Sequence, residues 1–213
     1  MSKIEIPKYT LGEELLNAIS HGVGALLGIA GLVLAIVFSK TPLAVVSSAI
    51  YGSTLIILYT ISCLYHSFSS KIKAKKVFRV LDHCSVYLLI FGTYMPYLLL
   101  VVKGALGWTL WGILLAMTIL GIVLNCVDIE KFKKFSMISY IAMGWVIILS
   151  FKKVYLNLGK IGTLYLVIGG LCYTIGAIFY KWGKKKKYMH SVFQFLVLAG
   201  SIFHFFSIFF YVL

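Results

Sequence analysis

Seven long apolar stretches, separated by short segments rich in charged or turn residues, constrain this chain more than any other feature. They cover residues 17–38, 44–68, 80–102, 105–127, 135–151, 161–181 and 189–212. A helix that crosses a bilayer needs about 20 mostly apolar residues, and most of these stretches reach that length. The sequence therefore predicts an all-α, polytopic membrane protein with seven transmembrane helices, built as a single domain over residues 1–213.

The composition supports this interpretation and excludes soluble classes of protein. Hydrophobic residues make up 61% of the chain and charged residues 12%, against about 45–50% and 25% in soluble domains. The net charge of +14 comes from lysines in short loops, where they set the topology and contact anionic lipid headgroups. We therefore expect membrane lipids, and no nucleic acid, as partners. The four cysteines are far apart in apolar stretches, which predicts neither disulfides nor a thiolate zinc site.

The distribution of Lys and Arg predicts the orientation. The N-terminal segment and the second, fourth and sixth loops carry fifteen of the 20 basic residues, and the other loops carry five. Basic residues concentrate on the cytoplasmic side of membrane proteins. We therefore expect the N-terminal segment, residues 1–16, in the cytoplasm and the C-terminus outside.

Ionisable side chains gather at the cytoplasmic ends of four predicted helices. His21 begins the first, His66 ends the second, Asp82 begins the third and His190 begins the seventh. Ionisable residues are costly in a membrane and indicate a functional site. Two or three imidazoles with a carboxylate form a typical zinc ligand set. Histidines hydrogen-bonded at the interface, and an Asp82–Arg79 pair, are structural alternatives that spacing leaves open.

Helical spacing places further polar residues beside these four. Residues three, four or seven apart share one face of a helix. Such spacing groups Glu14 and Asn17 with His21, Ser62 with His66, and Gln194 with His190.

Together these motifs resemble the hemolysin III branch of the progestin and adipoQ receptor family, which includes the adiponectin receptors. The resemblance covers essentially the whole chain. It rests on E-x2-N-x3-H (Glu14, Asn17, His21), on S-x3-H followed by Asp (Ser62, His66, Asp82), and on MHSVFQFLVLAGSIFHFF at 189–206.

The resemblance implies a seven-helix fold with a cytoplasmic N-terminus and a Zn²⁺ site near the cytoplasmic face. The family takes one ligand from S-x3-H, here His66, and two from H-x3-H on the last helix. His190 matches the first of these two, but Gln194 stands at the second, where it offers a poorer zinc ligand than imidazole. We expect His66, His190 and Asp82 to hold the metal. Asp82 and Ser62 are the predicted catalytic residues, with Glu14, Asn17 and His21 in support.

Three functions follow from these expectations, and the sequence leaves open whether the protein is an enzyme. The first is a zinc-dependent hydrolase of lipid amides or esters, since members of the family are similar to alkaline ceramidases. The second is a pore-forming hemolysin that causes cytolysis, although the ionisable residues concentrate at one end of the predicted bundle. The third is a non-catalytic sensor of lipid or metal. The basic residues, almost all Lys, and the family branch suggest a bacterial plasma membrane.

Overall fold

The computed structural model describes residues 4–183 and 186–213, and within these ranges it contains helices and no strands. The elements are α1 (Leu11–Val37), α2 (Pro42–Ser67), α3 (Lys73–Pro96), the π-helix η1 (Tyr97–Val102), α4 (Gly104–Gly144), the 3₁₀-helix η2 (Val146–Ser150), α5 (Phe151–Trp182) and α6 (Met189–Tyr211). Helical residues occupy every predicted apolar stretch, so the all-helical fold class is confirmed.

Local capping chemistry fixes where the first two helices begin. The Thr10 hydroxyl accepts a hydrogen bond from the Glu13 amide, and the Glu13 carboxylate accepts one from the Thr10 amide at 2.8 Å. This reciprocal pair is a capping box, which satisfies donors that a helix start leaves free. It starts α1 at Leu11, six residues before the predicted span. Thr41 caps α2, and Pro42 occupies its first turn, where proline loses no hydrogen bond.

Proline ends the regular part of the third helix. The sequence places Pro96 near the end of the third apolar stretch, and the α-helix stops there. The chain continues as η1 to Val102 and then turns at Lys103, whose φ is +52°. Proline lacks an amide proton and clashes with the preceding turn, which accounts for the change of helix type at this point.

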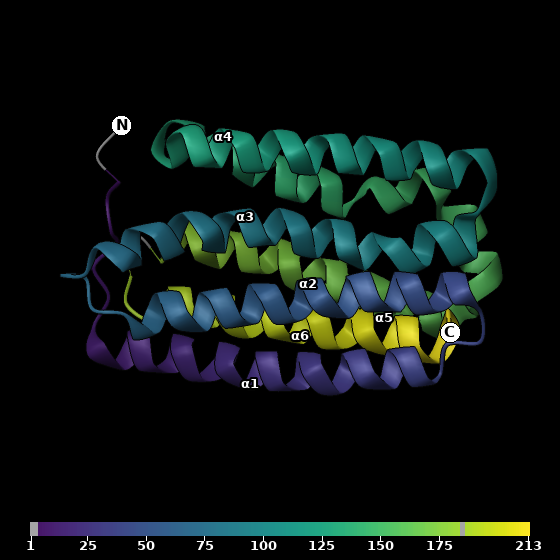
Figure 1. Ribbon diagram of the computed structural model, residues 1–213, viewed down its shortest axis with the longest axis horizontal. Coiled ribbons are helices and arrows are strands. Elements are labelled where there is room, and N and C mark those ends of the chain that lie inside the picture. Colours follow the sequence, from purple (N-terminus) through teal and green to yellow (C-terminus); the bar gives the residue numbers. More distant parts are fainter. Residues whose placement is uncertain (1–3, 184–185) are drawn as a thin grey trace.

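The chain from α4 to α5 leaves helical geometry at two internal residues. Asp128, inside α4, has φ −161° and ψ 93°, and Gly159, inside α5, has φ +68°. The Asp128 carboxylate accepts hydrogen bonds from the Glu130 and Lys131 amides, as at a helix start. Figure 1 shows that α4 folds back on itself, so that its second half runs beside its first.

The helices pack as a bundle with an apolar exterior. α1 contacts α2 and α6, α2 also contacts α3, α3 contacts α4, and α5 contacts α6. Large hydrophobic side chains such as Leu26, Val127 and Leu156 are more than two-thirds exposed. Polar side chains are buried instead, including Asn17 and Ser47, both 0% exposed. An apolar surface around a partly polar interior is the arrangement that a lipid solvent requires.

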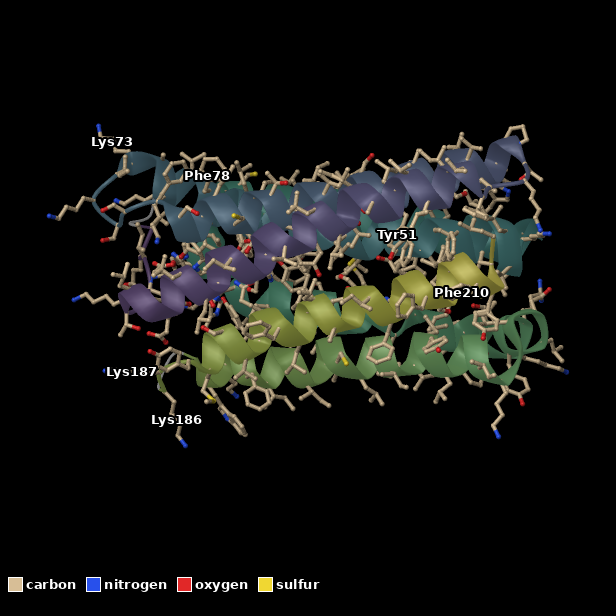
Figure 2. All side chains as sticks on the ribbon, turned by 90° about the horizontal axis from the view of Figure 1, so that it is seen from below. Tyr51, Lys73, Phe78, Lys186, Lys187 and Phe210 are labelled. Atoms are coloured by element: carbon tan, nitrogen blue, oxygen red, sulfur yellow. The ribbon has the colours of Figure 1, made fainter. Side chains whose placement is uncertain are left out.

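Five helical stretches are long and apolar enough to cross a membrane, and one of them runs from Gly104 to Trp182. The chain is therefore an integral membrane protein, while the predicted seven crossings and their orientation stay predictions. Figure 2 places Lys73, Lys186 and Lys187 at one end of the bundle and Phe210 toward the other. Lys184 and Lys185, predicted to contact headgroups, lie outside the described residues.

Candidate functional site

Two histidines from different helices converge on one glutamine at the lysine-rich end of the bundle. His66 is in the last turn of α2, and His190 is in the first turn of α6. Their ring centroids are 5.3 Å apart. The Gln194 side-chain nitrogen lies 3.0 Å from Nε2 of His66 and 3.2 Å from Nε2 of His190. All three side chains are buried, so the structure brings together two of the expected ligands, His66 and His190, with the glutamine that replaces a histidine in the family motif.

A carboxylate fixes the tautomer of His66. Glu14 Oε2 lies 2.6 Å from His66 Nδ1, and Glu14 Oε1 lies 2.5 Å from the ammonium nitrogen of Lys75. Because an ionised carboxylate only accepts hydrogen bonds, His66 Nδ1 is the donor to Glu14, and in the neutral imidazole Nε2 is then the nitrogen with the lone pair. Metal-bound histidines commonly show this arrangement, in which a carboxylate holds the other ring nitrogen. Lys75 is 1% exposed and also donates to the Phe68 carbonyl at 2.9 Å.

The other two residues of the first motif surround this pair. The side-chain nitrogen of Asn17, Nδ2, lies 3.5 Å from His66 Nδ1. His21 Nε2 lies 3.4 Å from the Gln194 backbone oxygen, and its ring meets Tyr59 edge-on at 4.9 Å. The i, i+3, i+7 spacing in α1 therefore directs Glu14, Asn17 and His21 toward the α2–α6 contact. Asn17 and His21 therefore lie beside the His66–His190 pair, and their supporting role stays a prediction.

Tyr9, which sequence reasoning missed, covers the two histidines. Its ring stacks on His190 at 4.8 Å with an interplanar angle of 24°, and lies 5.8 Å from the ring of His66. Burial raises the pKa of the Tyr9 hydroxyl, and the nearby Glu14 and Asp82 carboxylates raise it further. The hydroxyl therefore stays protonated. No sequence pattern marks Tyr9, because it precedes the helix and belongs to no periodic motif.

The structure places Asp82 and Ser62 less centrally. Asp82, on α3, is half-buried, and its charge acts on Tyr9 and Tyr65. Arg79 donates to the Glu130 carboxylate and to the Glu5 backbone oxygen. These contacts stand in place of the Asp82–Arg79 pair that helical spacing left open. Ser62 is buried on α2, one turn before the cluster histidine. The catalytic roles of Asp82 and Ser62 stay predictions.

Two imidazole nitrogens and one side-chain amide group are the possible metal donors at this site. Across residues 4–183 and 186–213, no three His, Cys, Asp or Glu side chains lie close enough together to hold a metal ion. However, Gln194 Oε1 is buried without a hydrogen-bond partner, and an amide group can rotate to exchange its oxygen and nitrogen. That rotation would turn the oxygen toward the Nε2 atoms of His66 and His190. His66, His190 and Gln194 could then hold a metal, while the predicted ligand Asp82, itself within the described ranges, shows no contact with any of these three side chains.

Sequence comparisons identify the family. The profile of the family described as "Haemolysin-III related" matches residues 9–205. Hemolysin-3 of Bacillus cereus is 43% identical over 204 residues, covering 94% of this chain and 92% of that protein. The chain belongs to the haemolysin-III-related family. The resemblance drawn from the three motifs is thereby confirmed.

Two further relatives extend the comparison. The hemolysin-3 homolog of Bacillus subtilis (strain 168) is 39% identical, covering 95% of this chain and 96% of that protein. The human monocyte to macrophage differentiation factor is 25% identical, covering 94% and 85%. The bacterial relatives and the long apolar helices point to a bacterial integral membrane protein. In this member of the haemolysin-III-related family, the matched region contains the whole Tyr9–His66–His190 cluster.

Proposed function

We propose that this member of the haemolysin-III-related family is a zinc-dependent hydrolase of lipid amides or esters in the bacterial plasma membrane. The observation that carries the proposal is the convergence of the His66 and His190 Nε2 atoms, with Glu14 holding the opposite nitrogen of His66. The cluster is buried at the lysine-rich end of the bundle, where anionic headgroups would bring lipid substrates close.

Each residue near the cluster has a separate task in this proposal. A zinc ion at such a site would polarise a carbonyl group and lower the pKa of a bound water. His66, His190 and the Gln194 oxygen would hold the ion. Asp82, on the neighbouring helix, accepts a proton, since a carboxylate is a suitable general base. Glu14 keeps the His66 proton on Nδ1, and the Tyr9 ring shields the histidines from bulk water.

Metal content tests the proposal directly. Purified wild-type protein should carry stoichiometric zinc, measured by inductively coupled plasma mass spectrometry, and His66→Ala and His190→Ala should each lose it. His204→Ala is the matched control, because His204 is buried on α6 but bonds the Leu166 carbonyl, away from the cluster. Zinc-free wild-type protein, or equal zinc in all four proteins, would show that the histidine pair is not a zinc site.

A non-catalytic sensor of metal or lipid is a second candidate, and Gln194 favours it. A neutral amide oxygen binds zinc weakly compared with imidazole, which harms turnover more than reversible binding. Hydrolysis of fluorescent lipid amides and esters by zinc-loaded protein separates the two functions. Asp82→Asn should abolish hydrolysis while zinc is retained. Zinc binding without hydrolysis of either substrate class would leave the sensor as the function.

We further infer that the chain crosses the membrane seven times, with the N-terminus in the cytoplasm. The stretch from Gly104 to Trp182 has 79 residues, so as one straight helix it would measure about 118 Å. That is about four times the 30 Å hydrocarbon core. Its breaks at Asp128 and Gly159 divide it into three passes, which with the four other long helices makes seven.

Reporter fusions test this topology. Alkaline phosphatase fused after Gly159 or after Leu213 should be active, because both positions lie outside the cell in the proposed topology. Green fluorescent protein fused after Asp128 should fluoresce, because that turn lies in the cytoplasm. The same reporter signal at Asp128 and Gly159 would contradict a crossing between them.

A further inference from the structure

A pair of cysteines lies against each other outside the histidine cluster. The Cys84 sulfur, on α3, is 3.9 Å from the Cys126 sulfur, on α4. Cys84 is 6% exposed, whereas Cys126 is exposed on the surface of the bundle. The other two cysteines, Cys63 and Cys172, are on α2 and α5. An oxidant can join two thiols that contact each other from different helices, although no sequence pattern pairs these two cysteines.

Close packing between α3 and α4 produces this contact. A Cβ atom on Gly121 would lie 2.1 Å from the ring of Tyr87, so only glycine allows the two helices to approach this closely. The same helices are linked nearby, since Tyr140 donates to the His83 carbonyl at 2.7 Å and Arg79 pairs with Glu130. The spacing of the two sulfurs is therefore set by the packing of the bundle on both sides of the pair.

We propose that Cys84 and Cys126 form a reversible intramolecular disulfide, and that a small-molecule disulfide is the oxidant. A disulfide requires sulfurs about 2.05 Å apart, so the two sulfurs must approach by about 1.9 Å in total. Side-chain rotation supplies part of that movement. The α4 backbone leaves helical geometry at Asp128, two residues after Cys126, and can adjust there.

The reaction proceeds by two exchange steps. The exposed Cys126 thiolate attacks the small-molecule disulfide, which forms a mixed disulfide and releases one small thiol. Cys84 then attacks the Cys126 sulfur and passes its proton to the second small thiol, which leaves. Two protein S–H bonds and one reagent S–S bond are lost, while one protein S–S bond and two reagent S–H bonds form. The protein is oxidised by two electrons and the reagent is reduced by two.

The disulfide would join α3 to α4 beside the proposed site. Asp82 is two residues before Cys84 on the same helix, so the bond fixes the helix that carries this carboxylate. Cys126 is two residues before the polar turn at Asp128, where a water-soluble oxidant can reach it. The proposal concerns only the two thiols and does not depend on metal binding or hydrolysis.

Intact-protein mass spectrometry tests the inference. Wild-type protein is treated with oxidised glutathione, its remaining thiols are alkylated without reduction, and both sites are mapped by peptide analysis. We expect two of the four cysteines to escape alkylation, joined in one Cys84–Cys126 peptide pair without a glutathione adduct. Cys84→Ser should instead keep glutathione on Cys126, because the second thiol is missing. Cys63→Ser/Cys172→Ser, which leaves the pair intact, should behave as the wild type.

Two results would overturn it. Wild-type protein that keeps four alkylated cysteines at every glutathione ratio lacks a reactive pair. Wild-type protein that accumulates glutathione on Cys126 without forming the peptide pair has thiols that cannot close. Because the wild type and the Cys63/Cys172 variant both retain the native pair, neither result depends on whether a substitution at Cys84 or Cys126 folds.

Discussion

The substitution Gln194→His is expected to tighten zinc binding by at least ~10–100-fold. Replacing a residue that only supports a metal ligand changes metal affinity by that factor, and a histidine at position 194 would itself be a ligand. Residue 194 follows His190 by one helical turn, and its side chain lies 3.0 Å from His66 Nε2. An imidazole there would replace a neutral amide with a much better zinc ligand. Competition with a fluorescent zinc chelator, using purified wild type and Gln194→His, measures the change in dissociation constant.

The matched control is Gln194→Met, which keeps the length of the side chain but removes its oxygen. We expect this variant to bind zinc more weakly than the wild type, so that the three proteins rank His, Gln and Met in order of affinity. An affinity that is the same in all three would mean that residue 194 supplies no ligand. The metal would then have to be held without residue 194 of α6.

Glu14→Ala is expected to lower the free energy of unfolding by about 3 kcal/mol. Glu14 is the carboxylate that pairs with Lys75, whose side chain is 1% exposed. Removing one partner of a buried ion pair leaves an uncompensated charge and costs about 3–5 kcal/mol. The lower end applies because the Glu14 side chain is 18% exposed and water can enter the space it leaves. Denaturant unfolding in detergent micelles, followed by tryptophan fluorescence, measures the loss.

Two further variants separate the buried charge from other effects of the substitution. Adding Lys75→Met to Glu14→Ala should restore part of the lost stability, since the unpaired ammonium is then gone. Lys133→Met is the surface control, because Lys133 pairs with Glu130 at 3.2 Å but is 47% exposed. Such pairs contribute less than about 1 kcal/mol. If Glu14→Ala were no more costly than Lys133→Met, Glu14 would not neutralise Lys75 in the folded protein.

The residues of the candidate site were predictable where they follow helical periodicity. Glu14, Asn17 and His21 share a face of α1, and all three reach the contact with His66 or Gln194. Periodicity also placed Gln194 beside His190 on α6. It fixes the angle of a side chain around its own helix axis, so it finds partners within an element.

The same reasoning did not identify Tyr9 or Lys75. Tyr9 precedes α1 and reaches His190 only because the capping box at Thr10 directs the chain across the end of the bundle. Lys75 is in a basic loop segment, which predicts an exposed lysine on the cytoplasmic side. Its ammonium is instead buried against Glu14. Contacts made by irregular segments and by long side chains have no periodic signature.

The sequence by itself determined that this chain is helical, that it belongs in a membrane, and that most of its ionisable residues collect at one end. Hydropathy and charge act residue by residue, and their averages over one helix are enough to set these properties. Only the tertiary structure decided that Gln194 lies between His66 and His190, and that Cys84 meets Cys126. Those contacts depend on how closely neighbouring helices approach. That distance is set where small residues pack against larger ones across an interface, as Gly121 packs against Tyr87. It cannot be predicted from the residues of one helix alone, because it depends on both partners.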